Sequence, residues 1–317
     1  MIPATVTETI AAECEILDSD RIRVGNAVLS VAAGDRGLLP GGGALPRLWR
    51  EIYWRYHLRQ ATAEPEVRRI PVLRNEEDPA FASELCLANA GKGWWAVGWR
   101  SLGNSRVSNG RVTLVASDEE IRSIGAGVMV RFPPALPYIS AGYYVAVSDA
   151  GPPQELHGGN VRLYANVGAA HASAVLQALT GFLADQQLPG VVKILNNPKS
   201  FGRSDSCVIY LERSGWDYYG DSLVNLLRNF LLSEPVSAFA LRIIDGLGFA
   251  EEDARGGRRT VASFGEIRSR LAAEGLAAAF NSGTGEGESA RAAGIRAAFY
   301  GSGLDPDQPY RARLATS

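Results

Sequence analysis

The chain has 317 residues, of which 46% are hydrophobic and 21% charged, and its formal net charge at pH 7 is −2. This length and composition are typical of one large globular domain with an accessory segment, or of two domains. The near-neutral charge argues against a nucleic-acid partner, which needs a strongly basic face. No apolar run approaches the ~18 residues that span a membrane, and the N-terminus lacks the basic and apolar pattern of a secretory signal. We therefore expect a cytoplasmic protein without a membrane partner.

Cysteine and histidine are too scattered to suggest a disulfide framework or a metal site. The three cysteines do not cluster, and the three histidines have no metal-ligand spacing. These residues are Cys14, Cys86, Cys207, His57, His157 and His171.

Residues 1–75 predict a small N-terminal accessory unit. A hairpin is expected at 22–31, because Gly25-Asn26 separates two short strand-like runs. Pro46 opens a predicted helix that ends near residue 60. Large aromatic or imidazole side chains recur along it at helical spacing: Trp49, Tyr53, Trp54, Tyr56 and His57. Such residues usually fill a core or anchor an interface, so we expect this unit to contact a partner rather than the reacting group.

Residues 76–317 predict a single domain in which strands precede helices. A helix is expected at 78–89. Alternation then predicts strands at 92–99, 111–115, 128–132 and 142–147, with 111–115 as the neighbour of 92–99 and a polar turn at 104–109 between them. Helical spacing recurs at 221–232, 238–245, 264–280 and 290–300. This order favours an α+β fold with a mixed, largely antiparallel sheet and packed helices.

A strand–helix–strand–strand unit occupies the centre of the chain. We expect its strands at 160–167, 191–195 and 207–211, with a helix at 169–185 after the first strand. Cations lie in or beside strands that otherwise look buried: Arg162, Lys193 and Arg203. Cations gathered on one face repel unless an anion joins them, and phosphate is the anion that guanidinium groups bind bidentately. The alternative is three separate edge-strand cations that point to solvent.

Lys193 stands alone in an apolar strand. Such a lysine either extends its amine to water or has a lowered pKa, and a neutral amine can take a proton from carbon. Tyr164 shares a strand face with Arg162 and could donate its phenolic proton to a leaving oxygen. The alternatives are that Tyr164 is an ordinary strand tyrosine and that His171 is the acid.

The chain resembles the HopA type III effector family of plant-pathogenic bacteria, and its stand-alone relatives in actinobacterial gene clusters for class V lanthipeptides and thioamitides. The central unit carries this resemblance together with residues 48–57, 141–147 and 263–268. More distantly, the central unit is similar to phosphothreonine lyase effectors and to the lyase domain of class III lanthipeptide synthetases. Those lyases have a Lys-x-His-x-Ser strand, a helix, a strand with the catalytic Lys, an Arg loop and a Tyr-bearing strand. The matching order here is Arg162-x-Tyr164-x-Asn166, helix, Lys193, Arg203 and Tyr210.

The resemblance implies a phosphothreonine-lyase-like core that needs neither metal nor cofactor. The implied reaction eliminates phosphate from phosphoserine or phosphothreonine in a precursor peptide, which a separate aminoglycoside-phosphotransferase-like kinase has phosphorylated. Dehydroalanine or dehydrobutyrine would be the product. The implied roles are Lys193 as base, Tyr164 as acid, Arg162 and Arg203 as phosphate ligands, Tyr210 as a supporting residue, and Arg268 as a further phosphate ligand, with Arg270 next.

Two other interpretations remain open. The chain could be a catalytically silent phosphopeptide-binding module of the effector type, or a scaffold that activates the kinase. A module that only binds has no use for a near-neutral amine, so Lys193 separates binding from lyase activity. For Arg268 and Arg270, the alternative is pairing with Glu266 and Glu274 along one helix.

Overall fold

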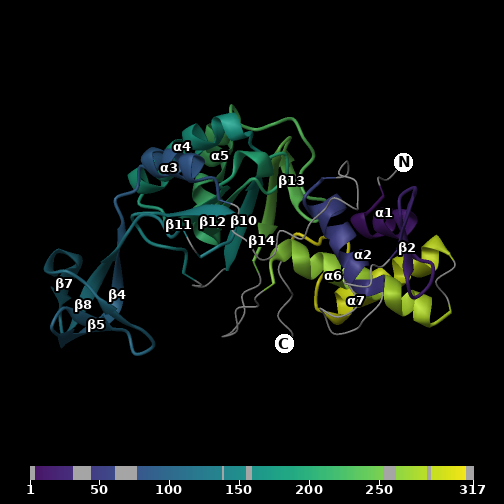
Figure 1. Cartoon of the computed structure of the whole chain (residues 1–317), viewed down its shortest axis with the longest axis horizontal. Coiled ribbons are helices and arrows are strands. Elements are labelled where there is room, and N and C mark those ends of the chain that lie inside the picture. The colour runs from purple at the N-terminus through teal and green to yellow at the C-terminus, as the bar shows by residue number, and fades with distance from the viewer. Residues whose placement is uncertain are drawn as a thin grey trace. The chain divides into compact units, whose positions relative to one another are not determined.

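The structure is a computed structural model that describes residues 4–30, 44–60, 77–137, 139–154, 159–252, 262–283 and 287–311 (Figure 1). Glycine- and proline-rich composition predicts linkers at 38–45 and 63–66. Residues 38–43, the whole of 63–66 and His157 lie outside the described ranges. None of the helices in the described ranges combines the length and apolar character that a bilayer crossing requires.

The chain divides into two compact units. The first contains residues 1–70, 203–205 and 233–317, and the second contains 71–202 and 206–232. The sequence predicted a boundary near residue 75, with the rest of the chain in one domain. The compact units differ from that division because the C-terminal helices join the N-terminal segment in the first unit.

The second unit contains the predicted strand–helix–strand–strand unit. Strands β10 (Asn160–Ala165), β12 (Cys207–Glu212), β11 (Gly190–Leu195) and β9 (Tyr143–Val147) lie side by side in that order, and each neighbouring pair is antiparallel. A 3₁₀ turn at Ala169–His171 leads into α4 (Ala172–Asp185), and α5 (Arg213–Leu227) follows β12. Helix α3 (Pro79–Ala88) precedes the strands, as predicted. The helix predicted at 221–232 is α5, which begins and ends earlier in the chain than predicted.

One face of these four strands is apolar. Its side chains are fully buried: Val161, Leu163, Val192, Ile194, Ile209 and Leu211. Helix α4 covers this face, because a Cβ at Gly190 would touch the side chains of both Leu183 on α4 and Leu211 on β12. Each fully buried Val, Leu or Ile contributes about 1.5–3 kcal/mol relative to exposure, so this face fixes the register of the strands. The polar residues of the same strands must then occupy the opposite face.

The second unit also contains a smaller antiparallel sheet, in the order β6 (Thr113–Val115), β5 (Arg106–Ser108), β4 (Trp94–Gly103), β8 (Gly127–Phe132) and β7 (Ile121–Ile124) (Figure 1). The predicted pairing of 111–115 with 92–99 is wrong. Strand β5 lies between them, inside the segment predicted to be a polar turn. The chain reverses direction at the start of the predicted turn, because Gly103, Asn104 and Ser105 all adopt positive φ and make a tight turn.

The first unit combines the two ends of the chain. Helix α1 (Val6–Glu13) leads into β1 (Cys14–Ile16) and the predicted hairpin, β2 (Arg21–Val24) and β3 (Ala27–Ser30). Helix α2 (Ala44–Ile52) continues into a π-helical turn at Tyr53–His57. Helices α6 (Phe264–Asn281) and α7 (Glu288–Gly301) confirm the predictions for 264–280 and 290–300, and α1 packs against both.

The helix predicted at 238–245 is wrong. These residues form strand β13 (Leu241–Ile244), which pairs with β14 (Leu247–Glu251). Gly246 has φ +74 and reverses the chain between the two strands. The left-handed conformation of Gly246 does not fit an α-helix. Leu241 is also exposed, so the apolar spacing of this segment reflects a hairpin.

Candidate active site

Arg162, Lys193 and Tyr210 lie on one face of the four strands, opposite the apolar face. Arg162 on β10 is directly across from Tyr210 on β12. Lys193 on β11 is across from Val208, which is two residues from Tyr210 on the same strand. Alternate residues of a strand share a face, as do directly paired residues, so all three side chains point the same way.

The two cations and two tyrosines form a cluster. The guanidinium carbon of Arg162 lies 5.1 Å from the centre of the Tyr210 ring. The amine of Lys193 lies 6.0 Å from the same ring and 4.7 Å from the ring of Tyr143. All four side chains are half-buried. We call Tyr143, Arg162, Lys193 and Tyr210 the cation–tyrosine cluster; its ring faces offset the repulsion between its cations.

Tyr143 is a member of the cluster that the sequence did not identify. It is paired with Leu195 on β11, two residues from Lys193, and therefore faces the same side. Its neighbour Tyr144 points to the apolar side, where its hydroxyl contacts Asn89 at 3.2 Å and burial raises its pKa to about 12. Strand alternation could have shown that only one of these adjacent tyrosines is on the polar face. Which one depends on the pairing of β9 with β11.

Tyr164 and His171, the two alternative acids, lie in different places. Tyr164 is across from Val208 on β12, so it shares the face of Arg162 and Lys193, and its side chain is buried. His171 is exposed at the start of α4, the helix that covers the apolar face, and its ring meets that of Phe230 edge-on at 6.4 Å. Tyr164 therefore has a strand position on the face of the cluster, and its role as acid stays a prediction.

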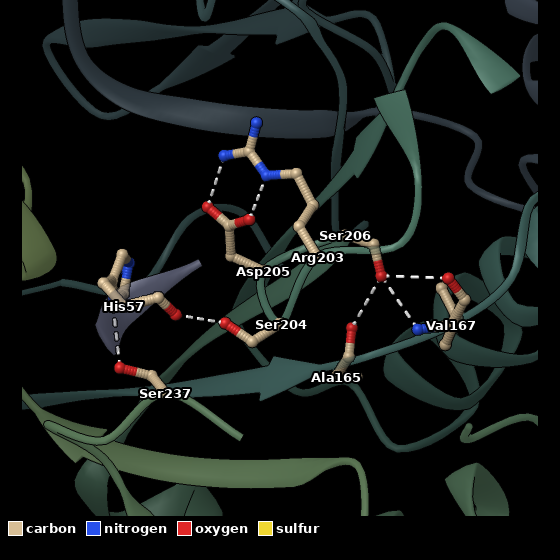
Figure 2. Close-up of polar contacts among 8 residues, drawn as sticks. All are labelled: His57, Ala165, Val167, Arg203, Ser204, Asp205, Ser206 and Ser237. Carbon is tan, nitrogen blue, oxygen red and sulfur yellow. Dashed lines mark hydrogen bonds and ion pairs between the residues drawn. The ribbon is translucent and has the colours of Figure 1, made fainter. Parts of the chain in front are cut away.

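Arg203 and its surroundings belong to the first unit. Its Nε and Nη2 donate to the two carboxylate oxygens of Asp205 at 2.5 and 2.8 Å (Figure 2). Only 14% of the Arg203 side chain and 7% of the Asp205 side chain are exposed. Ser204, between them, donates its hydroxyl to the His57 carbonyl, and the His57 ring contacts the Ser237 hydroxyl at 2.8 Å. The Nε and Nη2 edge of the Arg203 guanidinium is therefore already bound to a carboxylate.

This ion pair leads to a prediction about stability. Asp205→Ala should lower the free energy of unfolding by about 3–5 kcal/mol, because it leaves the Arg203 guanidinium buried without its carboxylate. Urea denaturation of the purified variants measures the change. Asp217→Ala is the matched control, since the Arg213–Asp217 pair has 40% and 57% of its side chains exposed. Loss of an exposed pair should cost below about 1 kcal/mol. Equal effects of the two substitutions would contradict the prediction.

Arg268 is buried in the first unit. Its Nε donates to the Pro309 carbonyl at 2.5 Å and its Nη2 to the Arg311 carbonyl at 3.1 Å, while the ring of Phe264 lies 3.6 Å from its guanidinium carbon. These contacts fasten the chain after α7 to α6. Glu266, one of the two acids suggested as helix partners of Arg268 and Arg270, caps α6 by accepting from the backbone N–H of Ser263. Phosphate binding by Arg268 stays a prediction, and its contacts favour a structural role.

Arg270, the second choice for a further phosphate ligand, lies over the ring of Trp49 at 4.9 Å. The π-helical turn at Tyr53–His57 also packs closely on α6, since a Cβ at Gly265 would overlap the His57 imidazole. The helix residues Tyr56 and His57 are buried, whereas Trp49, Tyr53 and Trp54 are half-buried.

The fold and the cluster define the class: an α+β protein built on antiparallel sheets, with paired cations and tyrosines on one sheet face. Residues 135–311 match the model of the HopA1 effector protein family. This match spans more than half of the chain, so the protein belongs to that family, as the resemblance had suggested.

Two solved structures of effector proteins from Pseudomonas syringae are similar to the chain. The one from pathovar tomato strain DC3000 has a TM-score of 0.47 and 14% identity, over 87% of this chain and 92% of that chain. The one from pathovar syringae strain 61 has a TM-score of 0.46 and 15% identity, over 82% of this chain and 87% of that chain. No curated protein sequence matches the chain.

Proposed function

We propose that the protein is a phosphoserine/phosphothreonine lyase, a carbon–oxygen lyase that eliminates phosphate from a phosphorylated precursor peptide. The observation that carries the proposal is the cation–tyrosine cluster, in which an arginine and a lysine share one half-buried sheet face. Arginine suits the substrate phosphate because it binds bidentately, and the lysine amine suits proton abstraction. The order of these residues along the central unit resembles that of phosphothreonine lyases, which supports the same reaction.

In the proposed elimination, the Lys193 amine takes the proton from the α carbon of the phosphoamino acid. The electron pair left behind forms the double bond between the α and β carbons, and the bond from the β carbon to oxygen breaks. Arg162 stabilises the charge on the departing phosphate, and Tyr164 donates a proton to the former bridging oxygen. Tyr210, whose ring is near both cations, supports the phosphate site. Arg203 and Arg268 remain predicted as further phosphate ligands.

We place this activity in lanthipeptide- or thioamitide-type biosynthesis in the cytoplasm, next to a separate aminoglycoside-phosphotransferase-like kinase. The half-buried aromatic residues of the first unit are the proposed contact with the kinase or the peptide leader. Deletion of residues 1–44 would not test this contact cleanly. Helix α1 packs against α6 and α7, so its loss would disturb the core of the first unit.

A single substitution tests the partner contact more cleanly. Trp54→Ala should reduce co-purification of the kinase, because partly exposed aromatic side chains anchor interfaces. The matched control is Leu87→Ala, which removes an exposed apolar side chain from α3 in the second unit. Full retention of the kinase by a folded Trp54→Ala protein would refute this contact.

One observation favours the second candidate function, a phosphopeptide-binding module without catalysis. The Lys193 amine lies near the ring faces of Tyr143 and Tyr210, and aromatic faces stabilise the charged ammonium form. A charged lysine binds phosphate well but cannot act as a base until it loses its proton.

Mass spectrometry separates the two functions. The protein is incubated with a phosphoserine- or phosphothreonine-containing candidate peptide, and binding is measured in parallel. A lyase should convert the peptide to a product lighter by one phosphoric acid. Tight binding with no change of mass would identify the module that only binds.

A further inference from the structure

The smaller sheet of the second unit has two unlike faces. One face holds an apolar core made by Trp99, Val107, Val128 and Val130. The other face carries four arginines and one tryptophan: Trp95, Arg100, Arg106, Arg122 and Arg131. We call these five residues the arginine face.

Strand pairing places two of the arginines around Trp95. Arg131 on β8 is directly across from Trp95 on β4. Arg122 on β7 is across from Met129, two residues from Arg131, and its guanidinium carbon lies 4.0 Å from the centre of the Trp95 ring. The three side chains therefore form one continuous group.

The other two arginines follow further along β4. Arg100 is across from Ser108 on β5, and Arg106 is two residues from Ser108 on the same strand. Arg100 and Arg106 are thus diagonal neighbours, about 7–8 Å apart between their backbones. Val115, across from Arg106, and Ile124, two residues from Arg122, add apolar side chains that are 80% and 49% exposed.

The charge of the arginine face is not balanced within the described part of the chain. All four arginines are exposed, and none forms an ion pair among the described residues. Arg131 donates to the backbone carbonyl of Lys92. Glu120, an acid near Arg131, is held by Ser117, whose N–H and hydroxyl lower its pKa more than Arg131 does. Neighbouring guanidinium groups on one sheet face repel one another, so an anion bound among them would be stabilised.

We propose that the arginine face binds an acidic stretch of polypeptide. Arginine forks match carboxylates bidentately, and the exposed Val115 and Ile124 can accept apolar side chains of the same segment. A nucleic acid fits less well, because Arg122 already covers the Trp95 ring on which a base would stack. The proposal concerns binding alone and does not depend on lyase activity.

A binding measurement on the full chain tests the proposal. The probe is a fluorescently labelled glutamate-rich peptide, and its anisotropy is followed at low and high salt. The paired variant Arg100→Gln/Arg106→Gln should bind about tenfold more weakly than the parent, and added salt should weaken parental binding. The matched control is Lys199→Gln/Arg228→Gln, which removes two exposed cations elsewhere in the same unit and should bind like the parent.

Each outcome decides the proposal. Selective loss of binding in the arginine-face variant supports it, and Arg122→Gln/Arg131→Gln should repeat the loss if the first pair folds poorly. No binding by the parent, equal binding by the parent and both arginine-face variants, or stronger binding of the glutamine counterpart of the peptide overturns it. Preferential capture of a single-stranded RNA probe also overturns it.

Discussion

Lys193→Ala is expected to abolish phosphate elimination while leaving phosphopeptide binding measurable. A positioned base contributes about 10²–10⁴-fold to a proton transfer, and the turnover of the variant should fall by at least that factor. The fall should appear in kcat, because the α proton is removed only in the transition state. Binding should persist through Arg162, which keeps its contact with Tyr210 on the same sheet face. Single-turnover measurements by mass spectrometry give the rate.

A second substitution at this position distinguishes the lyase from the binding module. Lys193→Arg keeps a positive charge but cannot act as a base near neutral pH, so a lyase should lose turnover and keep its affinity. Lys199→Ala is the matched control, since Lys199 is an exposed lysine of the same unit and should leave turnover unchanged. Near-parental turnover in Lys193→Ala would refute the assignment of the base.

The central unit could be predicted from the sequence because its signals are local. Alternation along 160–167 and the apolar stripe of 169–185 each define one element, and both elements form as β10 and α4. The shared face of Arg162 and Tyr164 follows from the same alternation within one strand. Pairing between strands is non-local, so the contact of Lys193 with Tyr143 could not be predicted. That contact depends on β9 lying next to β11 in one register.

The errors have several origins. The sequence predicts a helix where β13 and β14 form a hairpin, because apolar residues of short strands can fall at helical spacing. Gly246, with positive φ, makes the turn between the two strands. Asp205 is only two residues from Arg203 in the chain, but residues this close in a loop can point in different directions, so their ion pair could not be predicted. The arginine face could not be predicted from the sequence. Its members come from strands β4, β5, β7 and β8, and only the folded sheet brings them together.

Arg162→Lys is expected to reduce kcat/KM for a phosphopeptide by about 10- to 100-fold. The substitution keeps the charge but removes the planar fork, and a hydrogen bond to a charged group contributes about 1.5–3 kcal/mol. It also weakens the packing of a planar guanidinium against the ring of Tyr210, 5.1 Å away. Both KM and kcat should worsen, because Arg162 would hold the phosphate before elimination and stabilise its charge during departure. Arg228→Lys, an exposed arginine at the end of α5, controls for the change of residue type and should behave like the parent. Parental kinetics in Arg162→Lys would show that the phosphate is not bound by this residue, and the proposed orientation of the substrate on the sheet face would be wrong.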